Sequence, residues 1–179
     1  MPDEKNNLFL YEAIELRAEY DARIKTLKDL LPESRPNRDR RLFHRDDEAR
    51  TRPVRGFDLG QCRQEMGALN GKRRKLNSAI QRANFDNRVT VAGQEVAIAE
   101  ALEFRRAVNE RIGELSSQLA ASAYERVVHK ENRDIVECPD REYLEVQREL
   151  DEARRQFREL NRKLRAAAYT VAVDYKDEV

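Results

Sequence analysis

The sequence predicts a mainly α-helical protein: an elongated antiparallel four-helix bundle or coiled coil with small β-hairpins, made by internal duplication of a helix–β-hairpin–helix unit. Apolar side chains recur at alternating three- and four-residue spacing over four long stretches, as on the seam of an antiparallel bundle. The composition is typical of such proteins, because 39% of the 179 residues are charged and only 7% are aromatic. A nearly identical six-residue segment also occurs twice, as EAIELR from Glu12 and as EALEFR from Glu100.

This repeated segment belongs to a longer internal repeat. When residues 10–31 are aligned with residues 98–119, 8 of the 22 pairs are identical. Downstream, RLFHRDD aligns with RVVHKEN, which pairs His44 with His129, the two histidines of the chain. Similar blocks in the same order indicate a duplicated unit. We therefore predict a single domain over residues 1–179, with repeat unit one at about 8–86, repeat unit two at about 96–171 and an Arg-rich hairpin at 35–56.

Each unit is expected to hold two helices joined by a hairpin. The apolar seams of the four helices cover residues 10–31, 59–83, 98–119 and 143–167. RVVHKENRDIVEC clusters β-branched residues around a polar turn and predicts a β-hairpin. RVTVAGQEV predicts a second strand pair around Ala92 and Gly93, and TVAV near the C-terminus has a similar pattern.

Two helix starts carry capping signals. Asp58 is followed three residues later by Gln61, which is the spacing of a capping box. Pro139 and Asp140 supply a comparable stop and cap before the last helix.

Charge and cysteine usage limit the possible classes of protein. The net charge is +1, but residues 35–88 hold 15 basic and 7 acidic side chains, so that segment is basic. The sequence shows no signal peptide and no apolar run near the ~20 residues that a membrane span needs. Cys62 and Cys138 are the two cysteines, which fits a reducing compartment. We expect a cytoplasmic protein that does not bind membranes.

The chain resembles the septicolysin-like family of small bacterial helical proteins. The similar residues are the I-x-x-x-N pattern from Ile80, the turn with Gly93, EALEFRR from Glu100, and the cadence of the closing helix LEVQRELDEARRQFRELNRKLRAAAY. The resemblance covers roughly residues 60–170. Two positions depart from the family's pattern: Ala107 stands where an Asp is expected, and Ala168-Tyr169 replaces Asn-Trp. The resemblance implies a helical fold and brings no activity with it.

Polar side chains interrupt the predicted seams. Arg17 and Arg105 occupy equivalent seam positions, and Arg73 lies on the seam of the second helix. A buried guanidinium must be paired, so the interpretations are an internal ion-pair layer, a grip on an anionic ligand, or arginines that extend to solvent. The candidate internal polar layer comprises Glu12, Glu15, Arg17, Glu100, Glu103 and Arg105.

Motifs for catalysis or metal binding are missing from the sequence. His44 and His129 occupy equivalent hairpin positions, and their leading interpretation is structural pairing on a hairpin face. They could share a metal or a proton if the hairpins meet, but no zinc-like ligand spacing surrounds them. No Glu-x-x-His pair, nucleophile elbow or phosphate-binding glycine loop occurs. We therefore predict no enzyme activity and no cofactor.

The basic segment is the strongest candidate surface. Phosphates or partner carboxylates are the groups that such a segment would bind. Its candidate residues are Arg38, Arg40, Arg41, Arg45, Arg50, Arg52, Arg55, Lys72, Arg73, Arg74 and Lys75. We predict a helical interaction or assembly protein that forms a homo-oligomer or binds a protein partner. The alternative is an Arg-rich module that binds RNA or DNA.

Overall fold

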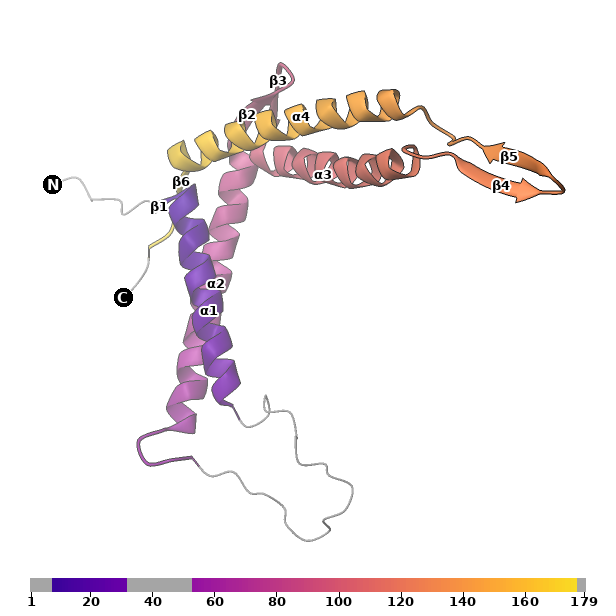
Figure 1. Ribbon diagram of the computed structural model, residues 1–179. Helices are drawn as coiled ribbons and strands as arrows, with labels where there is room; N and C mark the ends of the chain where they lie inside the picture. The colour runs from indigo at the N-terminus through magenta and orange to yellow at the C-terminus, as the bar shows by residue number, and fades with distance from the viewer. Residues whose placement is uncertain (1–7, 32–52, 177–179) are drawn as a thin grey trace, which may run out of the picture. The chain divides into compact units, whose positions relative to one another are not determined.

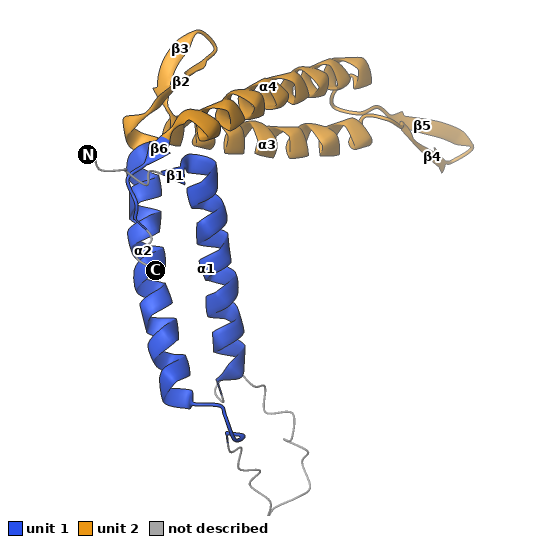
Figure 2. Cartoon of the chain, turned by 90° about the vertical axis from the view of Figure 1, so that its left-hand side faces the viewer, with its two compact units in different colours: residues 1–83, 172–179 blue, residues 84–171 orange. Residues whose placement is uncertain are grey.

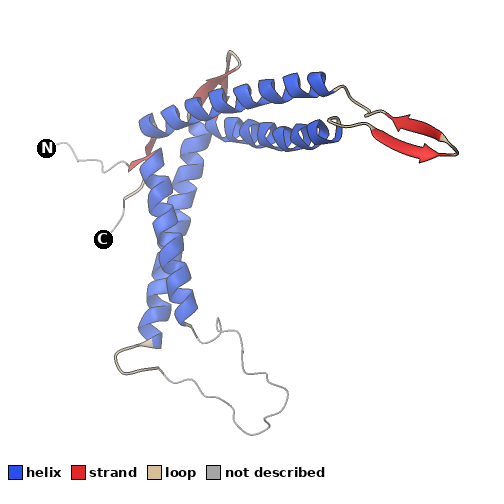
Figure 3. Ribbon diagram, viewed as in Figure 1, coloured by secondary structure: helices blue, strands red, loops and turns tan. Residues whose placement is uncertain are grey.

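The computed structural model describes residues 8–31 and 53–176, which form four helices and six short strands (Figures 1 and 3). In chain order the elements are β1 (Leu8–Phe9), α1 (Leu10–Leu30), α2 (Leu59–Asp86), β2 (Arg88–Val91), β3 (Gln94–Ala97), α3 (Ile98–Ala121), β4 (Arg126–Lys130), β5 (Arg133–Glu137), α4 (Tyr143–Thr170) and β6 (Ala172–Val173). The predicted fold class, mainly helical with small antiparallel hairpins, is confirmed. Within the described ranges, no helix combines the length and the low charge needed to cross a membrane.

The chain divides into two compact units. Unit 1 comprises residues 1–83 and 172–179, and unit 2 comprises residues 84–171 (Figure 2). The predicted repeat units, about 8–86 and 96–171, follow the duplication in the sequence, whereas unit 1 also includes the last strand.

In unit 1, α1 and α2 lie antiparallel along the predicted seams. Arg17 Nη1 donates to Asn77 Oδ1 at 3.1 Å. Closer to the C-terminal end of α1, Arg23 Nη2 donates to Glu65 Oε1 at 3.4 Å. Apolar side chains are buried along the seam, both between these polar contacts and beyond them. The buried members of the seam on the two helices are Leu10, Ala13, Tyr20, Cys62, Leu69, Leu76, Ile80 and Ala83.

Residues from the two ends of the described chain complete unit 1. β1 pairs antiparallel with β6, so that Leu8 lies opposite Val173 and Phe9 opposite Ala172. The sequence pattern of TVAV is similar to that of the strand pair around Ala92 and Gly93, which is a local hairpin. The TVAV strand instead pairs with the segment that precedes α1, and Val173 becomes fully buried there.

Unit 2 is built on the antiparallel pair α3 and α4. Its core holds Leu115 from α3 and Val146, Leu150 and Ala153 from α4, with Ile112 and Leu119 packed at the edge. Every one of these side chains lies on a seam that the three- and four-residue spacing predicted. The spacing therefore identified the helix faces correctly.

Each of the two units contains its own ion pair, and the two pairs lie at equivalent positions of the sequence repeat. Arg23 and Glu65 in unit 1 correspond, at the offsets of 88 and 84 residues in the sequence repeat, to Arg111 and Glu149 in unit 2. Arg111 Nη2 donates to Glu149 Oε2 at 3.4 Å, the same distance as in the unit 1 pair. The duplication thus extends from the sequence to the side-chain contacts.

The β2–β3 hairpin links α2 to α3. Its strands pair from Arg88 with Ala97 to Val91 with Gln94, as the sequence predicted. The turn residues Ala92 and Gly93 both have positive φ, 49° and 83°, which is the geometry of a two-residue type I′ turn. The hairpin packs against α3 and α4, and its Val96 is buried.

Of the two predicted helix caps, one is present. Asp58 Oδ1 accepts hydrogen bonds from the backbone N–H groups of Gly60 at 2.7 Å and Gln61 at 3.2 Å, as expected before α2. The prediction at Asp140 was wrong, because α4 begins at Tyr143 and its N-cap residue is Glu142, which makes no side-chain cap. The preceding link is held by side-chain contacts to both helices instead.

Candidate functional site

The β4–β5 hairpin of unit 2 forms the predicted ribbon between α3 and α4. Its five cross-strand pairs run from Arg126 with Glu137 to Lys130 with Arg133. The two turn residues, Glu131 and Asn132, have φ of 54° and 62° and form a type I′ turn. The hairpin extends beyond the ends of α3 and α4 (Figure 1).

Apolar side chains occupy both faces of this ribbon. Partners directly opposite each other point to the same face, so Val127 and Val136 share one face and Val128 and Ile135 share the other. Val127, Val136 and Ile135 are 59%, 49% and 38% exposed. No single surface of the protein could cover both apolar pairs, and among the described residues none of the helices packs on either.

The two hairpins of unit 2 differ in what covers them. β2 and β3 contact α3 and α4, and Val96 is only 8% exposed. β4 and β5 make their principal contacts with each other. An isolated two-stranded ribbon is marginally stable in water. The β4–β5 ribbon is therefore the hairpin that would gain more stability from being covered.

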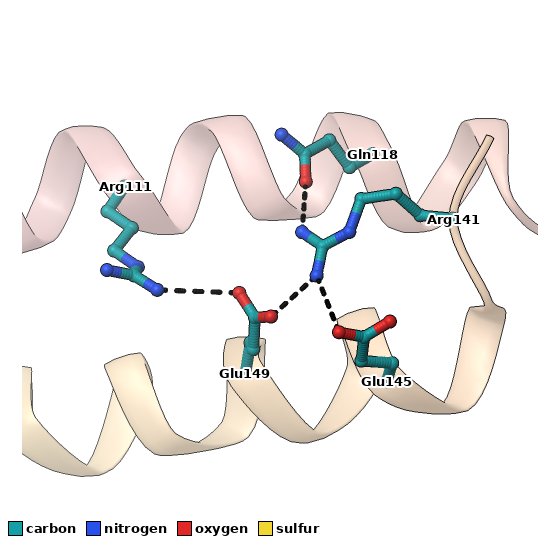
Figure 4. Close-up of polar contacts among 5 residues, drawn as sticks. All are labelled: Arg111, Gln118, Arg141, Glu145 and Glu149. Atoms are coloured by element: carbon teal, nitrogen blue, oxygen red, sulfur yellow. Dashed lines mark hydrogen bonds and ion pairs between the residues drawn. The ribbon is translucent and has the colours of Figure 1, made fainter.

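A polar cluster attaches the base of the ribbon to both helices (Figure 4). Arg141, in the link between β5 and α4, donates to Gln118 Oε1 on α3 at 2.9 Å and also to Glu149 on α4. A third contact joins Arg141 Nη2 to Glu145 Oε1 at 3.4 Å. Glu149 in turn accepts from Arg111. The link that leaves the ribbon is therefore held to α3 and α4 together.

Charge stabilises this cluster in its ionised form. The hydrogen bond from Arg141 lowers the pKa of Glu149, and the charges of Arg141 and Arg111 act in the same direction. Conversely, the hydrogen bond to Glu149 raises the pKa of Arg141. Both side chains are about one-third exposed, so water screens the pair in part. At neutral pH the cluster keeps both charges and holds the link in place.

The position of Arg141 in unit 1 is occupied by another kind of residue. At the offset of 84 residues, Arg141 corresponds to Phe57, which cannot donate to a carboxylate. The Arg141 contacts are therefore an addition to unit 2, made where the exposed ribbon leaves the helices. Sequence reasoning missed them, although Arg141, Glu145 and Glu149 follow the i, i+4, i+8 spacing of a helical ion-pair row.

The predicted internal polar layer is not a buried layer. Glu15, Glu100, Glu103 and Arg105 are exposed, and Glu103 pairs with Arg106 at 3.1 Å rather than with Arg105. Long side chains at the border of a helix pair can extend into water. A charged residue at a seam position of the heptad pattern is therefore not necessarily buried.

Among the described residues of unit 1, two members of the predicted layer make defined contacts. Arg17 is half-buried and donates to Asn77. Glu12 accepts from the backbone N–H of Phe9 at 2.7 Å and from the Tyr11 hydroxyl at 3.1 Å.

The histidine prediction can be followed at one position. His129 lies on the exposed ribbon with its Nδ1 2.7 Å from Asp134 Oδ1 on the opposite strand. His44 lies outside the described residues. In residues 8–31 and 53–176, no group of three His, Cys, Asp or Glu side chains is arranged to hold a metal ion.

Most of the predicted basic surface lies outside the described residues, namely Arg38, Arg40, Arg41, Arg45, Arg50 and Arg52. Arg55 is described and exposed. Arg73 pairs with Asp21 on α1 at 2.9 Å, and its side chain is partly exposed. The remaining three predicted residues lie together on α2. Lys72, Arg74 and Lys75 line a hollow of about 610 Å³ with Arg82 and Lys176.

The fold and site define a class of protein: paired antiparallel helices that carry an exposed, anchored β-hairpin. No protein-family model and no curated protein sequence matches the chain. A solved structure is similar to it, that of a functionally unknown conserved protein from Corynebacterium diphtheriae, with a TM-score of 0.69 and 19% sequence identity. The similarity covers 94% of this chain and 99% of that chain. It supports the fold, while the resemblance to the septicolysin-like family stays a prediction.

Proposed function

We propose that this protein is a non-enzymatic assembly protein and that the β4–β5 ribbon is the element through which it assembles. The observation that carries the proposal is the exposure of apolar side chains on both faces of a ribbon that no described helix covers. Edge strands and apolar ribbons of this kind are recurrent sites of protein association.

The exposed apolar surface is large enough to matter energetically. Complete burial of a Val or Ile side chain stabilises by roughly 1.5–3 kcal/mol, and Val127, Val136 and Ile135 keep about half of that area exposed. Covering all three would therefore contribute roughly 2–4 kcal/mol before the cost of ordering. This contribution is substantial for a small interface, and a ribbon whose base is held rigidly loses less entropy on binding.

The Arg141 cluster supplies that rigidity. Because Arg141 bonds to Gln118 on α3 and to carboxylates on α4, the ribbon leaves the helices in a fixed direction. A pre-organised binding element binds more tightly than a flexible one with the same side chains.

The test is the mass of the protein in solution. We expect light scattering after size exclusion to show a defined oligomer for the wild type and a lower mass for the double variant Val127→Thr/Val136→Thr. Threonine keeps the β-branched shape and strand propensity but removes apolar surface. Leu144→Gln is the matched control, since Leu144 is an exposed apolar residue of α4 outside the ribbon. A monomeric wild type at all concentrations would contradict the proposal.

A second candidate function, binding of nucleic acid, is favoured by the basic hollow of unit 1. Five cations line it, whereas Asp174 is the single acid among the lining residues. Along α2, Lys72 and Arg82 are ten residues apart and so about 15 Å apart along the axis. That distance spans about four phosphates of one strand of duplex DNA.

The salt dependence of binding tests this candidate. If five cations each contact a phosphate, the log–log slope of affinity against salt approaches about −4.5 for duplex DNA. The variant Lys75→Glu/Arg82→Glu should weaken binding in fluorescence anisotropy and make the slope shallower by about 2, whereas Arg165→Glu on α4 should leave both unchanged. Equal binding by both variants and the wild type would exclude the hollow as the binding site.

A further inference from the structure

We propose that strand β5 pairs antiparallel with β5 of a second copy of the chain, so that two β4–β5 ribbons join into one four-stranded sheet across a twofold axis. The inference rests on the proposed assembly function and names its partner and its register. In this register Ile135 lies opposite Ile135 of the second copy, and Arg133 lies opposite Glu137 of the second copy.

The backbone of β5 offers hydrogen-bonding groups at the right positions. The two-residue turn makes Lys130 and Arg133, which flank it, a hydrogen-bonded pair. Bonding alternates along an antiparallel ladder, so residues 133, 135 and 137 direct their backbone groups toward β4. Asp134 and Val136 direct theirs to the open edge.

The proposed register matches this alternation. Pairing centred on Ile135 places Asp134 of each copy opposite Val136 of the other, and these are the residues with outward backbone groups. All four outward residues of the two strands are therefore satisfied as hydrogen-bonded pairs, and the Ile135 residues form the closer, non-hydrogen-bonded pair.

Charge selects the same register. β5 reads Arg-Asp-Ile-Val-Glu, so its two ends carry opposite charges and the strand is complementary to its own reverse. Two Arg133–Glu137 pairs form across the axis. A shift of the centre to Asp134 would set two aspartates opposite each other, and a shift to Val136 would remove both Arg133–Glu137 pairs.

The outer edge of β4 does not offer this complementarity. β4 reads Arg-Val-Val-His-Lys, so pairing centred on Val128 would place Arg126 opposite Lys130 twice. Like charges directly opposite one another are destabilising. The strand β5 is therefore the edge that accepts a second copy.

The resulting sheet removes the deficiency of the isolated ribbon. On one face Val128, Ile135, Ile135 of the second copy and Val128 of the second copy form an uninterrupted apolar row. A four-stranded sheet with an apolar row is stable where a two-stranded ribbon is marginal. The twofold arrangement is closed, so it gives a dimer rather than a fibre.

A charge reversal at Arg133 separates pairing from folding. Arg133→Glu sets a glutamate opposite Lys130 within the ribbon, where two cations now face each other, and so improves the ribbon's own cross-strand pair. The same change sets glutamates opposite each other twice across the proposed axis. We expect the dimer of the full chain to weaken on the order of tenfold or more in sedimentation velocity.

A second variant permits a mixing experiment. Arg126 pairs with Glu137 in the ribbon, with Nη1 3.2 Å from Oε2, so Arg126→Glu/Glu137→Arg keeps that pair in reversed form. Alone this variant sets Arg133 opposite an arginine, and we expect it to be monomeric. Mixed with Arg133→Glu, it should form heterodimers, because both pairs across the axis then join opposite charges.

The outcomes distinguish the two proposals. Heterodimers in the mixture, from two variants that each dimerise more weakly than the wild type when alone, would support the β5 register. An oligomeric wild type whose mass does not respond to Arg133→Glu, while Val127→Thr/Val136→Thr lowers it, would overturn the register and leave the assembly function standing. A monomeric wild type would overturn both.

Discussion

Replacement of Leu150 by alanine tests the structural role of the α3–α4 core on which the ribbon stands. Leu150 is 1% exposed and packs with Leu115, Val146 and Ala153. Alanine removes three buried carbons, or about 2.4 kcal/mol of transfer free energy at ~0.8 kcal/mol each. The cavity adds to this, and the total for buried Leu→Ala changes is about 2–5 kcal/mol. We therefore expect unit 2 to lose about 3 kcal/mol.

Native-state hydrogen exchange followed by mass spectrometry measures this loss directly. Amides that exchange through opening of unit 2 should exchange roughly 100-fold faster in Leu150→Ala, since each 1.4 kcal/mol is a factor of ten. Leu144→Ala on the same helix is the control: Leu144 is 53% exposed, and the change should alter exchange by no more than about twofold. Similar acceleration in both variants would refute the assignment of Leu150 to the core.

Three further predictions concern local features. Asp58→Ala should destabilise the start of α2 by about 1 kcal/mol in chemical denaturation, whereas Asp58→Asn, which keeps an acceptor, should cost much less. Gly93→Ala should destabilise the protein by about 1 kcal/mol because φ is +83° at this position. Gly113→Ala should instead stabilise by up to about 1 kcal/mol, since Gly113 lies in a helix. Neither new Cβ meets another atom, so thermal melting of the two variants compares the backbone effects. Because Arg141 lowers the pKa of Glu149 below its ordinary 4.5, that carboxylate stabilises the fold above pH 4.5 and loses this effect as pH falls through the lowered value. Glu149→Gln should therefore flatten the acid side of the stability–pH curve, and an unchanged curve would contradict the assignment.

The helix faces and the β2–β3 and β4–β5 hairpins could be predicted because they depend on local periodicity, whereas most of the predicted hairpin at 35–56 lies outside the described residues. Residues such as Leu76 and Leu150 fall on seams whose spacing specifies both the helix and its buried side. The hairpin turns were also visible, since polar or glycine-containing pairs separate short β-branched runs. The duplication strengthened both inferences, because each helix of one unit has a counterpart in the other.

The depth of burial could not be predicted from the same patterns. Arg105 has the seam phase of Arg17, yet Arg105 is exposed and Arg17 is half-buried against Asn77. The β2–β3 and β4–β5 segments both show short apolar runs, but only the first lies against helices. Whether a ribbon is covered depends on where neighbouring helices end, which is a property of the tertiary structure.

The Arg141 cluster was missed for a related reason. Its partners come from α3, from α4 and from a link without regular structure, so the periodicity of no single helix includes them all. The spacing of Arg141, Glu145 and Glu149 was visible, but it resembled many other charged rows on these helices. The contacts with Gln118 and Arg111, both on α3, show that the row joins two helices.

The pairing of β1 with β6 makes the two units respond differently to truncation. All residues of unit 2 are continuous in the chain, from residue 84 to residue 171. Unit 1 needs Val173 beside Leu8 and the hydroxyl of Tyr175 near that of Tyr20, 155 residues earlier in the chain. We therefore expect a chain cut after residue 171 to keep a folded unit 2 with its exposed ribbon, and to lose stability in unit 1, where α1 and α2 would lack their last strand.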